Sequence, residues 1–144
     1  MLILDSDHVS LLYWGESKDG RRVFDRLNRV PPEEVATTIV SYEEQTRGWF
    51  SYMAQARTIT QQIEAYRRLH AHLDFYGKIQ VLDFDAAAAV EFQNLKRLQN
   101  RVGTFDLRIA AIAISRQATL LTRNTIDFER LPGLRFADWT LPEA

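Results

Sequence analysis

The chain has 144 residues, enough for one domain with a full hydrophobic core, and its 46% hydrophobic and 26% charged residues exclude general disorder. The absence of cysteine excludes disulfide scaffolds, thiol catalysis and cysteine-bound zinc, and the net charge of −1 excludes a polycationic nucleic-acid binder. No apolar run reaches the roughly 18 residues that cross a bilayer, and the opening MLILDSDH lacks the basic segment of a signal peptide, so we expect a cytoplasmic protein without membrane contact.

Short apolar or β-branched runs alternate along the chain with longer stretches in which apolar residues recur three or four apart. The short runs predict buried strands and the longer stretches predict amphipathic helices. In chain order we expect strand 1–4, helix 6–15, loop 15–20, helix 21–29, strand 35–40, helix 41–76 with a break near 56–58, strand 79–82, a helix from 83 or 85 to about 101, helix 106–116, strand 118–121, a polar loop 122–133 with one helical turn, and strand 134–139.

Capping and breaking residues set the boundaries of the helices. Ser41 and Glu44 have the spacing of a capping box, which predicts a helix start at Ser41. Gly77 ends the long helical region, and residues 103–104 (Gly-Thr) separate the last two long helices. The helix over 106–116 is apolar nearly all round and is therefore expected to be buried.

The alternation of strands and helices, without a hairpin signal between strands, predicts a mostly parallel sheet with helices on both faces. The sequence contains no internal repeat, linker or low-complexity segment. We therefore expect a single α/β domain over residues 1–144.

Ligands of open parallel sheets bind beyond the carboxyl ends of the strands, so the residues there are the candidates for a site. Acidic side chains follow three predicted strands and begin the buried helix. The candidates are Asp5, Asp7, Glu44, Asp106, Thr122, Arg123, Asn124 and Asp127. Carboxylates that converge in one cleft repel each other, and a divalent cation relieves this repulsion. Mg²⁺ prefers such oxygen ligands, and paired ions about 3.5–4 Å apart can activate water for phosphodiester cleavage.

Each acid also has a structural interpretation. Asp5 is more consistent with a site than with a cap, because it emerges from the middle of the sheet, whereas Asp7 fits a ligand and a helix cap equally. Glu44 can be the capping partner of Ser41, Asp106 can be a first-turn acid, and Asp127 can be an exposed loop acid. We expect the histidines to be structural: His8, His70 and His72.

Four blocks of the sequence, in order, resemble PIN-domain ribonucleases, and among these the VapC-like toxins of bacterial toxin–antitoxin modules. The blocks are residues 1–10 (MLILDSDHVS), 40–48 (VSYEEQTRG), 103–111 (GTFDLRIAA) and 120–128 (LLTRNTIDF). The resemblance covers nearly the whole chain, and the third block is the most specific. It implies a PIN-like three-layer α/β/α fold with four to five strands.

The resemblance also implies Mg²⁺- or Mn²⁺-dependent cleavage of RNA, with Asp5, Glu44 and Asp106 as catalytic metal ligands. Family members often carry an acid where Asn124 stands. Asn124 can still coordinate a metal through its carbonyl oxygen or a water, and Asp127 can supply the fourth carboxylate, so the resemblance leaves both open for the fourth position. With three acids, one metal ion is held more securely than two. Asp7 stands where asparagine is commoner and can restore some of the charge. The implied partners are an RNA substrate, a cognate small antitoxin and a second copy of the chain.

Supporting roles follow from the same resemblance. Arg123 and Arg108 are candidates for contact with the substrate phosphate, because arginine forks match phosphate oxygens, and Thr122 is expected to orient a ligand or water from behind. Two other phosphate-transfer families that use an aspartate after the first strand need a late lysine, and no lysine follows Lys96. A PIN-like RNA-binding or interaction module with weak catalysis is the remaining alternative.

Overall fold

The short apolar runs pair into one parallel sheet in a computed structural model, which describes residues 1–14, 17–98 and 101–143. Within those ranges the sheet has five strands in the order β3-β2-β1-β4-β5, and every neighbouring pair is parallel. The strands are β1 (Leu2–Leu4), β2 (Val35–Thr38), β3 (Gln80–Leu82), β4 (Thr119–Leu121) and β5 (Arg135–Ala137). The predicted α/β architecture is confirmed.

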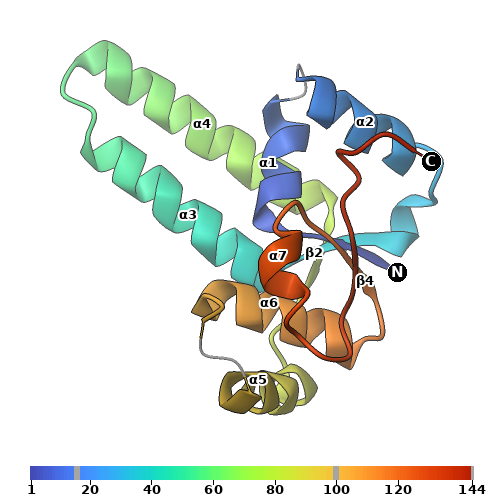
Figure 1. Cartoon of the computed structure of the whole chain (residues 1–144). Coiled ribbons are helices and arrows are strands. Elements are labelled where there is room, and N and C mark those ends of the chain that lie inside the picture. Colours follow the sequence, from blue (N-terminus) through green and yellow to red (C-terminus); the bar gives the residue numbers. More distant parts are fainter. Residues whose placement is uncertain (15–16, 99–100, 144) are drawn as a thin grey trace.

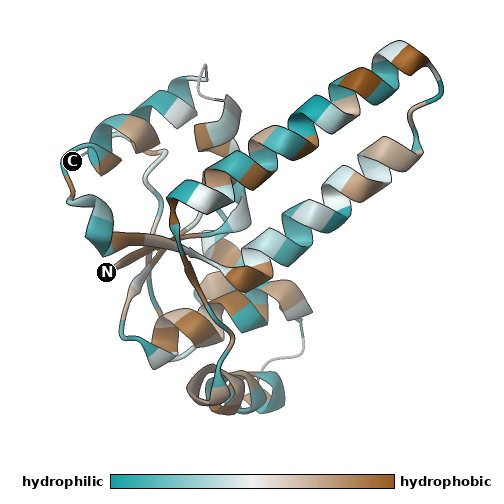
Figure 2. Ribbon diagram, turned by 180° about the vertical axis from the view of Figure 1, so that it is seen from behind, coloured by the Kyte–Doolittle hydropathy of each residue, from teal (hydrophilic) through white to brown (hydrophobic). Residues whose placement is uncertain are grey.

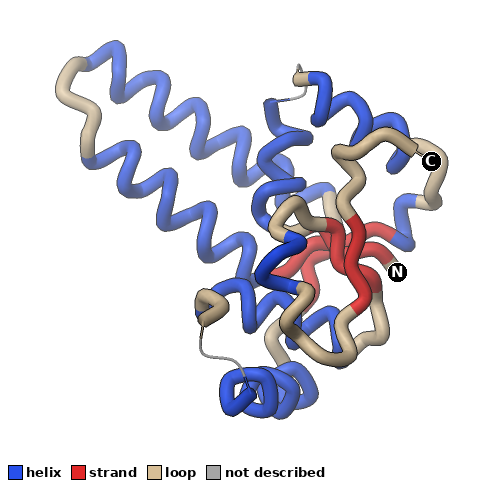
Figure 3. Tube along the Cα trace, viewed as in Figure 1, coloured by secondary structure: helices blue, strands red, loops and turns tan. Residues whose placement is uncertain are grey.

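Helices cover both faces of this sheet (Figures 1 and 3). They are α1 (Ser6–Trp14), α2 (Lys18–Leu27), the 3-10 helix η1 (Pro32–Glu34), α3 (Ile39–Ala54), α4 (Ile59–Lys78), α5 (Ala86–Leu98), α6 (Thr104–Ser115) and the single turn α7 (Thr125–Phe128). α3 and α4 form a long antiparallel pair that projects away from the sheet (Figure 1). Among the described residues, no helix combines the length and the apolar composition needed to cross a membrane.

Alternate residues of the central strands face opposite layers, as the pleat of a strand requires. Ile3 and Leu120 point into a core shared with α5 and α6, whereas Leu4 and Leu121 point into a second core with residues of α1 and α4. All four side chains are fully buried, and the strands form the apolar centre of the molecule (Figure 2). α6 is buried nearly all round, as its sequence predicts.

The start of α3 differs from the prediction. β2 ends at Thr38, where its pairing with β3 also ends. Thr38 caps the helix, because its hydroxyl accepts a hydrogen bond from the backbone N–H of Ser41 at 3.0 Å. Ser41 is buried within the first turn, so the predicted Ser41–Glu44 capping box is wrong. Burial of Val40 in the core outweighs the strand preference of the β-branched run.

Other boundaries move by a few residues. α2 begins at Lys18 rather than at residue 21, because the Ser17 hydroxyl accepts from the backbone N–H of Gly20 at 2.9 Å. Residues 15 and 16 of the predicted loop lie outside the described residues, as do residues 99 and 100 near the predicted end of α5. α6 begins at Thr104, two residues earlier than predicted, and β3, β4 and β5 are shorter than predicted.

The predicted break in the long helical region is confirmed. α3 ends at Ala54, and Thr58 begins α4 with a capping box in which its side chain and that of Gln61 each accept from the other's backbone N–H. α4 continues through Gly77 to Lys78, two residues beyond the predicted last helical residue, Tyr76.

The sheet order determines where a site can lie. β1 is central. The chain runs from β1 to β2 and β3 on one side and then crosses over to β4 and β5 on the other, and such a reversal of strand order creates a crevice at the carboxyl ends of β1 and β4. Leu4 pairs with Leu121, so the residues after these two strands lie side by side.

Candidate active site

Asp5 is the first residue after β1, and its position is fixed by backbone and side chain together. Its backbone N–H donates to the carbonyl of Leu121 at 3.1 Å, which extends the pairing of β1 with β4. Its Oδ1 accepts from the backbone N–H of His8 at 2.8 Å, and the residue is only 6% exposed. Asp5 therefore caps α1 with one oxygen and keeps the other for a further partner.

Glu44 lies on α3 and faces the start of α1. The Ser6 hydroxyl donates to its Oε1 at 2.5 Å. The neighbouring Gln45 donates its side-chain amide to the Ser6 carbonyl at 2.8 Å and to the Ser10 hydroxyl at 3.0 Å. These bonds tie α1 to α3 and fix the carboxylate of Glu44. Ser6 and Gln45 are not among the candidates named from the sequence; their positions beside Asp5 and Glu44 were the available signal.

Asp106 lies in the first turn of α6, where other acids surround it. Its pKa is raised to about 6, first by burial and then by the charges of Glu44, Asp5 and Asp127, whereas a hydrogen bond from Asn124 lowers it. The structure thus brings together carboxylates from four separate segments of the chain, at the edge where the strand ends predicted them. Their mutual repulsion is the electrostatic condition that a divalent cation relieves.

Asn124 joins two of these acids. Its side-chain Nδ2 donates to Oδ2 of Asp106 at 3.3 Å and to Oδ2 of Asp127 at 3.0 Å. Behind it, the hydroxyl of the fully buried Thr122 accepts from the backbone N–H of Asn124 at 3.0 Å. Thr122 therefore supports Asn124.

Arg123 makes its contacts with carboxylates of this chain. Its guanidinium holds both oxygens of Asp7, at 2.5 and 2.8 Å, and Oδ2 of Asp19 at 3.2 Å. The hydrogen bonds to Asp7, together with the charge of that carboxylate, raise the pKa of Arg123. Arg108 lies elsewhere, with its guanidinium carbon 5.3 Å from the ring centre of Phe92 on α5. The structure thus places Arg123, but not Arg108, beside an acid that the sequence assigned to the site.

The sequence left His8 open as a packed or a surface histidine; the structure packs it against Asp5, a position that the sequence interpretation missed. It is fully buried, its Nδ1 lies 3.5 Å from Oδ1 of Asp5, and neither ring nitrogen has a hydrogen-bond partner among the described residues. Asp5, Asp7 and His8 each offer a ligand atom within 4.8 Å of the others, alone among groups of three in the described ranges. The bond from Arg123 already satisfies Asp7 in this group. The three-residue spacing from Asp5 on one helical turn was the available signal.

The remaining acids have the chemistry of a site for a hard divalent ion. Carboxylate oxygens are the ligands that Mg²⁺ and Mn²⁺ prefer, and two to four of them suffice when water completes the coordination. Asp5, Glu44 and Asp127 lie near enough to Asp106 for their charges to add to the effect of burial on its pKa. No three of these four acids offer oxygens that all lie within 4.8 Å of one another, so an ion bound here would draw the carboxylates closer together. The residues present therefore fit the metal that the family resemblance implies.

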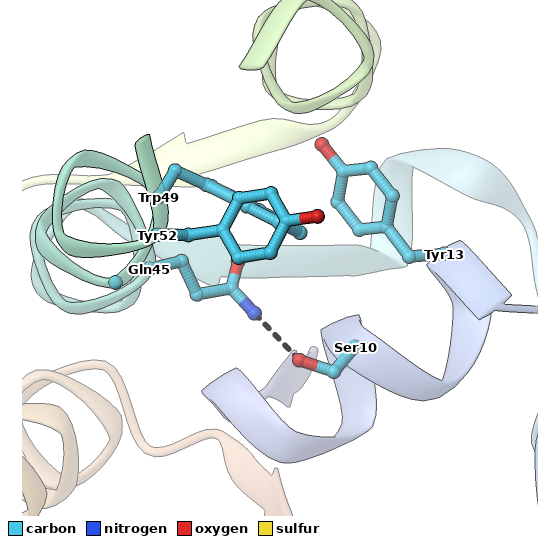
Figure 4. Close-up of a pocket in the computed structure, with 6 residues that line it drawn as sticks. Ser10, Tyr13, Gln45, Trp49 and Tyr52 are labelled. Carbon is cyan, nitrogen blue, oxygen red and sulfur yellow. Dashed lines mark hydrogen bonds between the residues drawn. The ribbon is translucent and has the colours of Figure 1, made fainter. Parts of the chain in front are cut away.

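An apolar cavity of about 340 Å³ opens between α1 and α3, and Gln45, the chain neighbour of Glu44, lines part of it (Figure 4). Trp49 and Tyr52 form one wall in an edge-to-face pair with ring centres 5.9 Å apart. Tyr13 faces them from α1, and the hydrogen bond between Gln45 and Ser10 crosses the space below (Figure 4). A cavity with aromatic walls suits a flat or apolar group from a partner molecule.

Comparisons with known proteins agree with this fold. The family model described as PIN domain matches residues 3–134. The tRNA(fMet)-specific endonuclease VapC of Shigella flexneri is 44% identical over 70 residues, which are 46% of this chain and 53% of that protein. The chain thus spans about half the length of the first curated relatives that it matches. Ribonuclease VapC1 of Haemophilus influenzae R2866 is 28% identical over 121 residues, 82% of this chain and 84% of the relative.

Solved structures show the same fold at lower identity. The DNA-bound VapBC structure from Salmonella typhimurium superposes with a TM-score of 0.72 and 24% identity, over 96% of this chain and 97% of that chain. The structure of VapBC-1 from nontypeable Haemophilus influenzae superposes with a TM-score of 0.75 and 23% identity, over 97% of this chain and 98% of that chain.

Proposed function

The chain belongs to the PIN-domain family, and from this premise we propose that it is a metal-dependent endoribonuclease acting as the toxin of a toxin–antitoxin pair. The observation that carries the proposal is the convergence of Asp5, Glu44, Asp106 and Asp127 on one edge of the sheet, where burial first and then the charges of the other three raise the pKa of Asp106. The ribonuclease names of the relatives support RNA as the substrate.

Asp5, Glu44 and Asp106 would hold Mg²⁺ or Mn²⁺, and Asp127 would lie next to them as a fourth carboxylate. The bound ion supplies a Lewis acid for the phosphate and lowers the pKa of a coordinated water. The protein's own contribution is to fix the acids: the backbone of α1 holds Asp5, and the Ser6 hydroxyl holds Glu44. Fixed ligands lose little freedom when they bind, which favours catalysis.

Arginine forks match phosphate oxygens, so Arg123 is the better candidate for the substrate backbone. It lies beside the acids and is about two-fifths exposed, and binding would require it to exchange Asp7 for a phosphate. Arg108 stays a second candidate, at the start of α6.

The partner we propose is a small antitoxin that inserts an apolar group between Trp49 and Tyr13, in the cavity between α1 and α3 (Figure 4). Several similar solved structures are named as toxin–antitoxin complexes, which supports such a partner. We also propose a single domain over residues 1–144, a homodimer and a cytoplasmic location, where an RNA substrate is available.

The test is cleavage of purified tRNA(fMet) and of total cellular RNA with Mg²⁺, with Mn²⁺ and with EDTA. We expect the wild type to cleave RNA only with metal, and Asp5→Asn and Asp106→Asn to lose at least about 100-fold in rate, the scale on which acid–base and electrostatic groups act. Asp25→Asn, an exposed acid on α2, is the matched control and should retain full activity.

The alternative is a PIN-shaped RNA-binding module with weak catalysis. Two observations favour it: Asn124 brings no charge to the acids, and Arg123 neutralises Asp7. RNA binding without cleavage at millimolar metal, unchanged by Asp106→Asn, would replace the nuclease with this module.

A further inference from the structure

The side-chain amide of Asn124 is placed where two acids meet. Both of its hydrogen bonds run from Nδ2, one to Asp106 and one to Asp127, so the two carboxylates share one donor group. The opposite orientation of the amide would turn its carbonyl oxygen toward two negative oxygens and lose both bonds. The acids themselves therefore determine which end of the amide faces them.

The neighbouring acids have their own donors. Asp5 accepts from the backbone of His8, Glu44 accepts from Ser6, and Asp7 is paired with Arg123. Among the contacts described, Asn124 is the donor that Asp106 and Asp127 have in common. The partly positive hydrogens of its amide reduce the repulsion between the two carboxylates, as a small cation would, although the amide carries no net charge.

A close pair of divalent ions needs carboxylates that bridge them or ligate both. The pair Asp106 and Asp127 is suited to this, since both acids face one point. That point is taken by the amide, which repels a cation through its partly positive hydrogens. With an aspartate at position 124, three carboxylates would meet there without a donor.

We infer that Asn124 is a positioning residue that holds Asp106 and Asp127 together in place of a second cation, so that the site takes a single divalent ion. The inference rests on the proposed function, because it assumes that the acids bind a metal. It assigns Asp127 to the support of Asp106 through Asn124. It also predicts that one substitution, Asn124→Asp, creates a second metal position.

The experiment is titration of Mn²⁺ into the metal-free chain by calorimetry, with electron paramagnetic resonance on the same samples. We expect the wild type to bind one ion per chain and to show an uncoupled manganese spectrum. Asn124→Asp should bind two ions and show a spin-coupled spectrum. Asn94→Asp adds the same charge on α5, where Arg97 donates to the side-chain oxygen of Asn94 and none of the site contacts described above is made, and it should behave as the wild type.

Thermal unfolding gives an independent reading. In EDTA, Asn124→Asp should melt about 3 °C or more below the wild type, and saturating Mn²⁺ should raise its melting temperature by more than it raises that of the wild type. Asn124→Ala, which loses the donor without adding charge, should also melt lower in EDTA and still bind one ion.

Two ions in the wild type or in Asn124→Ala, or one ion in Asn124→Asp, would overturn the inference while leaving the nuclease intact. If the wild type and Asp106→Asn both fail to bind Mn²⁺ and to cleave RNA, the proposed function fails and the inference with it. If Asn124→Asp unfolds in EDTA, it is prepared with Mn²⁺ bound, and the ions that remain per chain after desalting are counted. Two ions per chain support the inference, and one ion per chain overturns it.

Discussion

Asp106→Asn should make the metal-free protein more stable while it removes activity. The carboxyl group of Asp106 is partly buried among like charges, which raises its pKa from 3.8 to about 6. Asparagine has nearly the same shape and carries no charge. The substitution therefore removes the repulsion from Glu44, Asp5 and Asp127 without creating a cavity.

The size of the effect follows from the pKa of Asp106. A rise from 3.8 to about 6 corresponds to at most about 3 kcal/mol at pH 8, because each pKa unit is worth about 1.4 kcal/mol. The group is partly exposed to water, so screening reduces this to about 1 kcal/mol. For a chain of this length, about 1 kcal/mol corresponds to a rise of about 3 °C in melting temperature.

The pH dependence has a definite sign. Because the pKa of Asp106 is higher in the folded state, the folded protein keeps this proton between about pH 4 and 6, where the unfolded chain has lost it. The contribution of protonated Asp106 to the free energy of unfolding is therefore fully present below its unfolded pKa, and it is lost as the pH rises through about 6. Asp106→Asn removes this loss, so the two proteins should converge near pH 3.5 and differ most at pH 8.

The assay is thermal and urea unfolding in EDTA at several pH values, with Asp25→Asn as the control for removing an exposed acid. Addition of Mn²⁺ should reverse the order, since the wild type gains binding energy that the variant has lost. A melting temperature of Asp106→Asn at or below that of the wild type at pH 8 in EDTA would refute the argument from repulsion.

Two further predictions concern Arg123 and His72. Arg123→Lys keeps the charge but not the two-oxygen contact with Asp7, so it should cost about 1 kcal/mol in urea unfolding, and Arg123→Ala at least as much; unchanged unfolding in both would contradict the pairing. Burial lowers the pKa of His72, so its contribution to stability is present above its unfolded pKa of 6.5 and is lost as the pH falls below it. His72→Gln should flatten the stability profile between about pH 7 and 5, whereas the exposed His70→Gln should not, and equal profiles would show that His72 is not the cause.

Local patterns were sufficient for much of the fold. The spacing of apolar residues along the chain predicts which side chains are buried. It did so for the apolar run before Asp5 and for the nearly all-apolar helix after Asp106, and the alternation of strands and helices predicted the layers. The parallel sheet and the position of the acids at its edge followed from that alternation. Local pattern failed where tertiary packing outweighed it, as at Thr38, which caps α3 because the sheet ends there.

The contacts that define the site depend on the order of the strands. Arg123 meets Asp7 across 116 residues, and Asn124 meets Asp106 across 18. A sequence gives the donors and acceptors of these side chains but not which of them face each other. Only the placement of β4 beside β1 brings Arg123 and Asn124 to the acids, because pairing adjacent strands in parallel puts their carboxyl ends at one edge. By itself the sequence determined the layers and the acids, and the tertiary structure decided which donor each acid meets, because those donors come from segments that only the sheet brings together.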